Sequence, residues 1–318
     1  MILSVLLPVR DGEPTLRRAL RCLRRQNDTG LPLEIVVGDD GSRDGSASLA
    51  EREAARDPRI RVLRLERRGL VPTLNAALEA ARGAWIGRMD ADDLCTHDRF
   101  RQQLEYAVSD PRVDVMGTRV RMFPAREVTP GMRRFLAWQN RLVTHEAMVD
   151  NIHVETPLMN ASAVFRREAL ERVGGWRAFD GPEDLDLFLR GLEAGWRFGK
   201  VPRDLYFWRE RAERITRTDA RYRRAAFRRT VLESLLRTLP QARGLTLLGW
   251  GESYTYWEQA LREAGRLIRA EPVNPRSVRG GAPLPQMKST LLALAYGTEP
   301  SRETLRAALR GRPALHLA

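Results

Sequence analysis

The first third of the chain alternates short apolar runs with helix-like segments. The runs ILSVLLPV, LEIVVGDD, IRVLRL and AWIGRM read as buried strands, and the segments between them carry leucine and alanine at helical spacing. Strands that are apolar on both faces and separated by helices indicate a parallel sheet covered by helices. We therefore expect an α/β fold with a Rossmann-like, mostly parallel sheet.

Polar residues follow three of these strands, at 8–11, 39–42 and 90–93. Ligands bind at the carboxyl ends of the strands in sheets of this kind. Because these ends meet at one edge of a parallel sheet, we expect the three loops to converge on a single site.

The stretch MDADDL places three carboxylates, Asp90, Asp92 and Asp93, in four consecutive positions. Oxygen ligands without a histidine or cysteine cluster favour a hard cation, Mg²⁺ or Mn²⁺, which can bridge a diphosphate. A calcium loop would need further spaced ligands and a bidentate glutamate, which do not follow. The first domain has no phosphate-binding glycine loop, which argues against a phosphoryl transferase.

A later segment, PEDLDLFLRGLEAG, reads as a helix that opens with Glu183 and Asp184. Acidic residues in a first helical turn are ordinary partners of the helix dipole, so this position alone does not identify a catalytic group.

The pattern changes after residue 218. Residues 219–240 form an arginine-rich amphipathic segment, for which a bridge between domains and a membrane-surface helix are both open. A strand and helix pattern restarts at 241–318, and its turn LLGWGES lacks the third glycine of a dinucleotide site. We predict a first domain at 1–218, a linker helix at 219–240 and a small Rossmann-like α/β domain at 241–318.

Composition bears on whether the protein binds nucleic acid, spans a membrane or carries disulfides. The net charge of +13 comes almost entirely from arginine, which fits a general arginine bias better than a phosphate-binding surface because no basic run is interleaved with aromatics. The chain has no apolar run long enough for a membrane helix. With only two cysteines among 318 residues, a reducing cytoplasm is the expected location.

In their order, several segments resemble the inverting glycosyltransferases of family 2: SVLLPVRDG, IVVGDDGSRDGS, GLVPTLNAALEAARGAWIGRMDADDL, VFRREALERVGGWRAFDGPEDLDLFLRGLEAGWRFGKV and YFWRERAERITR. The resemblance covers about 3–217. It implies the A-type glycosyltransferase fold, transfer from a nucleotide-diphosphate sugar to an acceptor hydroxyl, and Mn²⁺ or Mg²⁺ as cofactor. Polysaccharide or glycoconjugate assembly is the implied setting.

The resemblance also implies roles for ten residues. Asp184, with Glu183 beside it, is expected to be the catalytic base, and Asp92, supported by Asp93, is expected to bind the metal. The donor is expected to contact Pro8, Asp11, Asp39, Asp40, Asp90 and Arg209. Two positions depart from the family pattern: Arg10 stands where small or aromatic residues are usual, and Asn160 where relatives often carry His-Pro.

The expected partners are a UDP-sugar donor and a glycan or glycolipid acceptor, with peripheral association at the inner face of a membrane left open. No nucleic acid is expected. Two rival functions remain: a nucleotidyltransferase on a related fold, and a non-catalytic protein that binds phosphate or nucleic acid. The acidic triplet argues against the second rival, because clustered carboxylates repel a polyanion.

Overall fold

A computed structural model describes residues 2–26, 30–211, 214–239, 245–280, 284, 292–295, 299–309 and 314–317. The chain divides into two compact units. The first comprises Met1–Met148 and Pro157–Tyr222, and the second comprises Val149–Thr156 and Arg223–Ala318. The predicted boundary at residue 240 lies outside the described residues.

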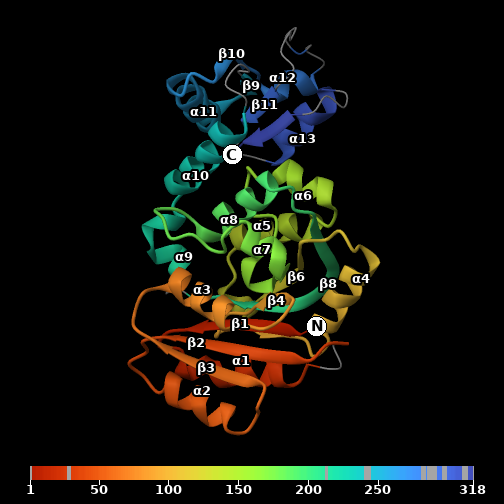
Figure 1. The fold of residues 1–318 in the computed structure, drawn as a ribbon. Helices are drawn as coiled ribbons and strands as arrows, with labels where there is room; N and C mark the ends of the chain where they lie inside the picture. Colours follow the sequence, from red (N-terminus) through yellow and green to blue (C-terminus); the bar gives the residue numbers. More distant parts are fainter. Residues whose placement is uncertain are drawn as a thin grey trace. The chain divides into compact units, whose positions relative to one another are not determined.

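The first unit is built on an eight-stranded sheet with the order β3-β2-β1-β4-β7-β6-β8-β5 (Figure 1). Its strands are β1 (Leu3–Val9), β2 (Leu33–Asp40), β3 (Ile60–Leu65), β4 (Trp85–Arg88), β5 (Leu94–Cys95), β6 (Val115–Phe123), β7 (Val164–Arg166) and β8 (Phe198–Arg209). The four strands predicted from the first third are all present and mutually parallel. The expected α/β fold is confirmed.

Two strands run against this direction. Strand β7 is antiparallel to both β4 and β6, and the two-residue β5 is antiparallel to β8. The long strands β6 and β8 are parallel to each other, with register shifts between Thr118 and Val120. The short β5 follows the acidic triplet directly, so β8 holds the end of that loop in the sheet.

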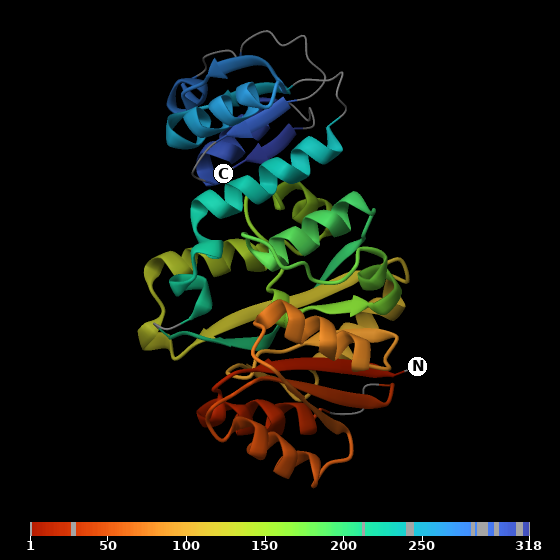
Figure 2. The ribbon, with the colours of Figure 1, turned by 60° about the vertical axis from the view of Figure 1, so that its left-hand side comes forward.

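Helices cover both faces of the sheet (Figure 2). Those of the first unit are α1 (Glu13–Arg24), α2 (Ser46–Ala54), α3 (Leu70–Ala80), α4 (Arg99–Ser109), α5 (Pro130–Arg141), α7 (Arg167–Arg172), α8 (Glu183–Glu193) and α9 (Ile215–Thr218), with 3₁₀ turns η1 (Ala125–Glu127), η2 (Asn160–Ser162) and η3 (Ala220–Tyr222). Helix α6 (His145–Asn151) begins in the first unit and ends in the second. Helix α3 lies very close to β2, because a Cβ atom on Gly38 would come within 2.8 Å of Thr73 Cγ2. Glycine at this position therefore permits the close approach of helix and strand.

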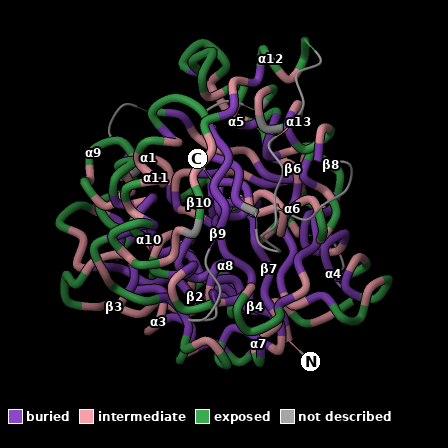
Figure 3. The backbone as a smooth tube through the Cα atoms, turned by 90° about the horizontal axis from the view of Figure 1, so that it is seen from above, coloured by how far each residue is buried: buried purple, intermediate pink, exposed green. Residues whose placement is uncertain are grey.

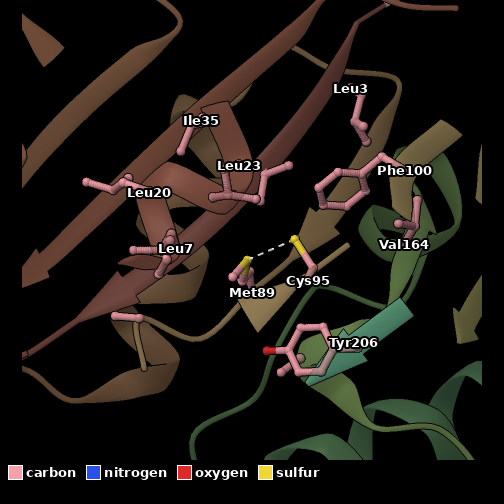
Figure 4. Close-up of a cluster of buried hydrophobic side chains, with 14 of the residues drawn as sticks. Leu3, Leu7, Leu20, Leu23, Ile35, Met89, Cys95, Phe100, Val164 and Tyr206 are labelled. Carbon is pink, nitrogen blue, oxygen red and sulfur yellow. Dashed lines mark hydrogen bonds between the residues drawn. The ribbon is translucent and has the colours of Figure 1, made fainter. Parts of the chain in front are cut away.

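The core follows the alternation of side chains along the strands. On one face of β1, Leu3 and Leu7 pack with Leu20 and Leu23 of α1 (Figure 4). These leucines have no exposed surface. Buried backbone follows the strands, whereas exposed backbone follows the outer turns of the helices (Figure 3). This packing fixes the carboxyl ends of β1, β2 and β4 relative to one another.

The second unit has a four-stranded parallel sheet with the order β10-β9-β11-β12. Its elements are α10 (Arg224–Thr238), β9 (Leu245–Gly249), α11 (Gly251–Glu263), β10 (Leu267–Pro272), α12 (Pro275–Arg279), β11 (Leu292–Ala295), α13 (Glu299–Ala308) and β12 (Ala314–Leu317). A small apolar core joins Leu248, Leu294 and Leu305. The second α/β unit expected from the sequence is therefore present. In the described part of the chain, no helix combines the length and hydropathy required to span a bilayer.

Candidate active site

A cavity of about 750 Å³ lies where β1, β2 and β4 end. Seven of the ten predicted site residues line it: Pro8, Asp11, Asp40, Asp90, Asp92, Glu183 and Asp184. The other three, Asp39, Asp93 and Arg209, are not among its lining residues. The structure thus brings together the three loops that the strand pattern predicted, and adds the start of α8.

The loops after β1 and β2 hold each other. The N–H of Arg43 donates to Asp11 Oδ1 at 2.7 Å, and the N–H of Asp11 donates to Ser42 Oγ at 3.0 Å. Asp11 has φ +49°, which is uncommon for a residue other than glycine. This loop-to-loop bonding fixes one wall of the cavity.

The two aspartates at the end of β2 have different surroundings. Asp40 Oδ1 accepts hydrogen bonds from the N–H groups of Arg68 (2.7 Å) and Gly69 (3.0 Å) at the start of α3. Arg10 Nη1 lies 3.6 Å from Asp40 Oδ2. Asp39 is buried, and its Oδ2 accepts from the N–H of Ser42 at 3.3 Å. Asp40 therefore faces the cavity, whereas Asp39 stabilises the turn behind it.

The acidic loop after β4 forms the opposite wall. A carboxylate oxygen from each of Asp90, Asp92 and Asp93 lies within 4.8 Å of the other two. Arg88 Nη2 is 3.0 Å from Asp90 Oδ1, and Arg211 Nη2 is 3.1 Å from Asp92 Oδ2. Asp93 is fully buried, and both of its oxygens are engaged, one by the Tyr206 hydroxyl (2.6 Å) and one by the N–H of Arg209 (2.7 Å).

The electrostatics of this loop are unfavourable for three negative charges. Burial, and after it the charge of Asp90, raises the pKa of Asp92. Burial and the charges of Asp90 and Asp92 raise the pKa of Asp93 well above its usual range. A nearby cation would favour the charged carboxylates and relieve this repulsion.

The donor set fits a divalent cation. Carboxylate oxygens are the ligands that Mg²⁺ and Mn²⁺ prefer, and three of them converge here. Asp93 already accepts two hydrogen bonds from the protein, so Asp92 and Asp90 are better placed to present oxygens to an ion in the cavity. Among the described residues, Arg211 is the one ion-pair partner of Asp92, and the Arg211 side chain is about half exposed.

The start of α8 supplies two further carboxylates. Glu183 is buried, and its Oε2 accepts a hydrogen bond from the Tyr222 hydroxyl at 2.6 Å. Asp184 lines the cavity, and its Oδ1 accepts from the N–H of Leu185 at 2.8 Å. Burial, and after it the charge of Glu183, raises the pKa of Tyr222, so this phenol stays a hydrogen-bond donor.

A buried arginine lies between the two acidic groups. Arg88 is at the end of β4 and lines the cavity. Burial opposes its charge, but the carboxylates of Asp90, Glu183 and Asp184 outweigh burial and raise the pKa of Arg88. Arg88 is therefore a permanent positive charge in the cavity beside Asp90.

Arg209, the arginine predicted from the sequence, is not among the arginines that line the cavity. Arg209 Nε donates to the carbonyl of Asp92 at 2.7 Å, and its guanidinium lies 4.5 Å from the centre of the Phe123 ring. It supports the acidic loop from behind. Arg211 reaches the cavity, as does Arg214, which stacks on the Trp208 ring at 3.6 Å.

Sequence analysis missed several lining residues. Arg88, Arg211, Arg214 and Tyr222 were assigned no role, and Asn160 was noted only as a departure from the family pattern. The one signal in the sequence for these cavity residues was the density of arginine in RERAERITRTDARYR. Clustered arginine creates a positive potential that attracts anionic ligands. Arg211 pairs with Asp92 and Tyr222 with Glu183, and both of these partners lie far away in the chain, so spacing could not reveal the two pairs.

The chain is similar to proteins of a known family. The family model described as "Glycosyl transferase family 2" matches residues 4–174, more than half of the chain. The Erwinia amylovora amylovoran biosynthesis glycosyltransferase AmsE is 30% identical over 204 residues, which cover 63% of this chain and 73% of AmsE. The Bacillus subtilis putative glycosyltransferase EpsE is 26% identical over 69% of this chain and 77% of EpsE.

Other relatives share a shorter segment. The uncharacterised glycosyltransferase EpsJ of Bacillus subtilis is 34% identical over 116 residues, and the match spans 36% of this chain and 33% of EpsJ. The match to the putative glycosyltransferase EpsH likewise spans 30% of that protein.

Two solved structures share the fold. Staphylococcus aureus TarS, crystallised with UDP-GlcNAc, has a TM-score of 0.58 and 20% identity over 76% of this chain and 69% of the TarS chain. The Pyrobaculum calidifontis mannosyltransferase PcManGT, in complex with GDP-Man and Mn²⁺, has a TM-score of 0.56 and 21% identity over 97% of this chain and 75% of its own.

Proposed function

Because this chain belongs to glycosyl transferase family 2, we propose that it transfers a sugar from a nucleotide-diphosphate sugar to an acceptor hydroxyl with inversion at the anomeric carbon. The observation that carries the proposal is the convergence of Asp40, Asp92 and Asp184 in one cavity. The proposed reaction needs a nucleotide site, a cation site and a base for the acceptor, and these three carboxylates come from the end of β2, the acidic loop and the start of α8.

The nucleotide is assigned to the wall formed by the β1 and β2 loops. Pro8 and Asp11 line this wall, and Asp40 presents a carboxylate whose position is fixed by two backbone N–H groups. A fixed carboxylate can accept hydrogen bonds from the N–H groups of a base. Asp90, at the other wall, is assigned to the ribose. Asp39 acts from behind this wall as a support for the turn.

The diphosphate is assigned to the acidic loop and Arg211. Asp92, with Asp90 beside it, would hold Mn²⁺ or Mg²⁺, and Asp93 keeps the loop in place through Tyr206 and Arg209. When bound, the cation supplies Lewis acidity to the departing diphosphate. Arg211 lies beside Asp92 and offers a guanidinium to the same phosphate oxygens. We therefore assign a diphosphate contact to Arg211, whereas the resemblance implied only a donor contact, at Arg209.

The acceptor hydroxyl is assigned to Asp184. A carboxylate on the face opposite the leaving group must remove the proton of the attacking hydroxyl, since inversion requires attack from that face. Both Asp184 and Glu183 line the cavity, but Glu183 is buried and its Oε2 is already bonded to the Tyr222 hydroxyl. Asp184 therefore takes the proton at its carboxylate oxygen, and Glu183 anchors the start of α8.

The acceptor class follows from the relatives. AmsE is named for amylovoran biosynthesis and ExoO of Rhizobium meliloti for succinoglycan biosynthesis. A glycan or glycolipid in polysaccharide or glycoconjugate assembly is the acceptor that these names support. We place the reaction in the cytoplasm, where nucleotide sugars are the donors.

A donor screen tests the proposal. The full chain is heated with UDP-glucose, UDP-N-acetylglucosamine, GDP-mannose, UDP or GDP, each with and without MnCl₂, and unfolding is followed by fluorescence. A ligand that binds the native state raises the unfolding midpoint by mass action. We expect at least one nucleotide sugar to raise it only when Mn²⁺ is present. No shift with any nucleotide, or release of pyrophosphate from a nucleoside triphosphate and a sugar phosphate, contradicts the proposal.

A further inference from the structure

Asn160 lies in η2, the turn that precedes β7, and lines the cavity. The residue is 3% exposed. Both polar atoms of its amide, Oδ1 and Nδ2, lack a hydrogen-bond partner within the described part of the protein. Buried polar groups are nearly always paired, so a wholly unpaired amide needs an explanation.

The backbone around Asn160 is firmly held, which excludes a disordered turn as that explanation. The N–H of Ala163 donates to the carbonyl of Asn160 at 3.0 Å, and the N–H of Ser162 donates to the carbonyl of Met159 at 2.8 Å. The N–H of Arg88 donates to the carbonyl of Ala163 at 2.9 Å. The turn is thus bonded to the end of β4, and the amide is kept in place without a protein partner.

The chemistry of the amide selects the kind of ligand that could pair with it. It offers one acceptor oxygen and two N–H donors side by side. A phosphate or carboxylate only accepts hydrogen bonds and would leave Oδ1 unpaired. A hydroxyl both donates and accepts, so two neighbouring hydroxyls of a sugar can satisfy the oxygen and the nitrogen together.

The position of the turn agrees with this chemistry. Asn160 lines the same cavity as Asp90 and Asp92 of the acidic loop and Asp184 of α8. In the proposed reaction the transferred sugar must lie between the diphosphate and the base. The nucleotide wall of Asp11 and Asp40 is formed by other loops and has its own polar contacts.

We propose that Asn160 is a specificity-determining residue that binds two adjacent hydroxyls of the transferred sugar. Oδ1 accepts a hydrogen bond from one hydroxyl, and Nδ2 donates to the oxygen of the next. This inference rests on the proposed function, because it needs a nucleotide sugar in the cavity. A donor that lacks one of these hydroxyls, or carries it with opposite configuration, leaves part of the amide unpaired and binds more weakly.

The test compares Asn160→Leu with the unaltered chain by calorimetry in the presence of Mn²⁺. The probes are UDP-glucose, UDP-N-acetylglucosamine and GDP-mannose, each paired with its free nucleoside diphosphate, UDP or GDP. We expect the Kd of the bound nucleotide sugar to rise about tenfold or more in Asn160→Leu, because a buried amide no longer pairs with the sugar. The Kd of the free nucleoside diphosphate should change less than about twofold.

Stability provides a second readout. Asn160→Leu should unfold at the same temperature as the unaltered chain or higher, because it removes a buried unpaired amide. Asn140→Ala is the matched control: the Asn140 side chain bonds both the N–H and the carbonyl of Val120 at 2.9 Å. We expect this control to unfold at a lower temperature and to keep the ratio of the two Kd values.

Four outcomes overturn the inference. Three results would contradict the proposed sugar contact in Asn160→Leu. They are a Kd that rises equally for the nucleotide sugar and the nucleoside diphosphate, a Kd that rises for neither, and a lower unfolding temperature. An unchanged donor Kd with a raised acceptor KM assigns the amide to the acceptor instead. If the unaltered chain binds UDP or GDP but no nucleotide sugar, or binds none of the probes, the proposed function fails first. The two failures are thus distinguishable.

Discussion

The hydroxyl of Tyr206 donates a hydrogen bond to Asp93 Oδ2 over 2.6 Å, and neither residue is among those that line the cavity. The N–H of Arg209 takes the other oxygen of Asp93. One member of the acidic triplet is thus a structural anchor, which leaves Asp90 and Asp92 for a ligand. Three carboxylates that look equivalent in the sequence therefore divide into two kinds.

Asp92→Ala should abolish cation-dependent donor binding and leave the fold intact. Removing a residue that only hydrogen-bonds to a metal ligand typically lowers metal affinity about 10–100-fold. Removing the ligand Asp92 itself should therefore raise the Kd of a nucleoside diphosphate in the presence of Mn²⁺ by about 100-fold or more. Removing one of several repelling carboxylates should not lower the unfolding temperature. Calorimetry and thermal unfolding measure the two effects.

Glu105→Ala is the control for Asp92→Ala. Glu105 is an exposed carboxylate that pairs with Arg101 on the surface of α4. It should bind donor and cation like the unaltered chain. Normal cation-dependent binding by Asp92→Ala would show that the metal ligands lie elsewhere.

Asp184→Asn should slow transfer while donor binding persists. Asparagine keeps the shape and most polar contacts but cannot take the proton of the acceptor. Turnover should fall by roughly 10²-fold or more, or about 2.7 kcal/mol of transition-state stabilisation. The rate and the donor Kd are measured on the same protein.

Asp186→Asn, two residues along α8, separates catalysis from stability. Asp186 is buried and paired with Arg177 and Arg190. Its substitution should lower the unfolding temperature, since it weakens a buried ion-pair network. If Asp184→Asn turned over normally, Asp184 would be only a partner of the helix dipole, and a loss of donor binding would assign it to the donor side.

Arg211→Ala should weaken the binding of the diphosphate. A hydrogen bond to a charged group contributes about 1.5–3 kcal/mol, so the Kd of a nucleoside diphosphate should rise by roughly 10–100-fold. The Kd of the corresponding nucleoside should stay unchanged, because Arg211 is not assigned to the base or the ribose. Arg126→Ala, at a strongly exposed side chain, is the matched control. Equal weakening of nucleoside and diphosphate would argue against a phosphate contact.

Cys22 should react with iodoacetamide at an unusually low pH. A hydrogen bond from the Cys95 thiol, helped by Arg25 and Arg21, lowers the pKa of Cys22 to about 6. The thiolate is the reactive form, so the rate should rise with pH through about 6 and be flat by pH 8. Cys95 is buried with its pKa raised, and should stay unmodified in the folded chain.

Cys22→Ser serves as the control for alkylation, measured by mass spectrometry across the pH range. It should show no modification of the native protein. A rate that keeps rising above pH 8 would indicate an ordinary thiol at Cys22.

The sequence predicted the sheet and the convergence of its loops because both depend on local patterns. Strands apolar on both faces define β1, β2 and β4, and parallel strands bring Asp40 and Asp92 to the same edge. The start of α8 was visible from its acidic first turn. The roles assigned to these carboxylates remain predictions.

What the sequence could not provide is the environment of each side chain. Arg209 and Arg211 look equivalent in FWRER, and only the pairing of Arg209 with the acidic loop distinguishes them. Tyr222 and Glu183 form a hydrogen bond although they are 39 residues apart in the sequence, and no helix or strand periodicity relates the two positions. The unpaired state of the Asn160 amide is a property of the packed cavity and has no counterpart in sequence spacing.

The anchoring of the acidic loop by β8 also determines when the site can exist during synthesis. Asp93 precedes its partners Tyr206 and Arg209 by 113 and 116 residues, so it leaves the ribosome well before them. Closing so long a segment reduces chain entropy, which is offset only when β5 pairs with β8. A nascent chain that ends before β8 therefore lacks the two hydrogen bonds that hold Asp93. The proposed cation and donor affinity should accordingly arise only in a first unit that has been synthesised through β8.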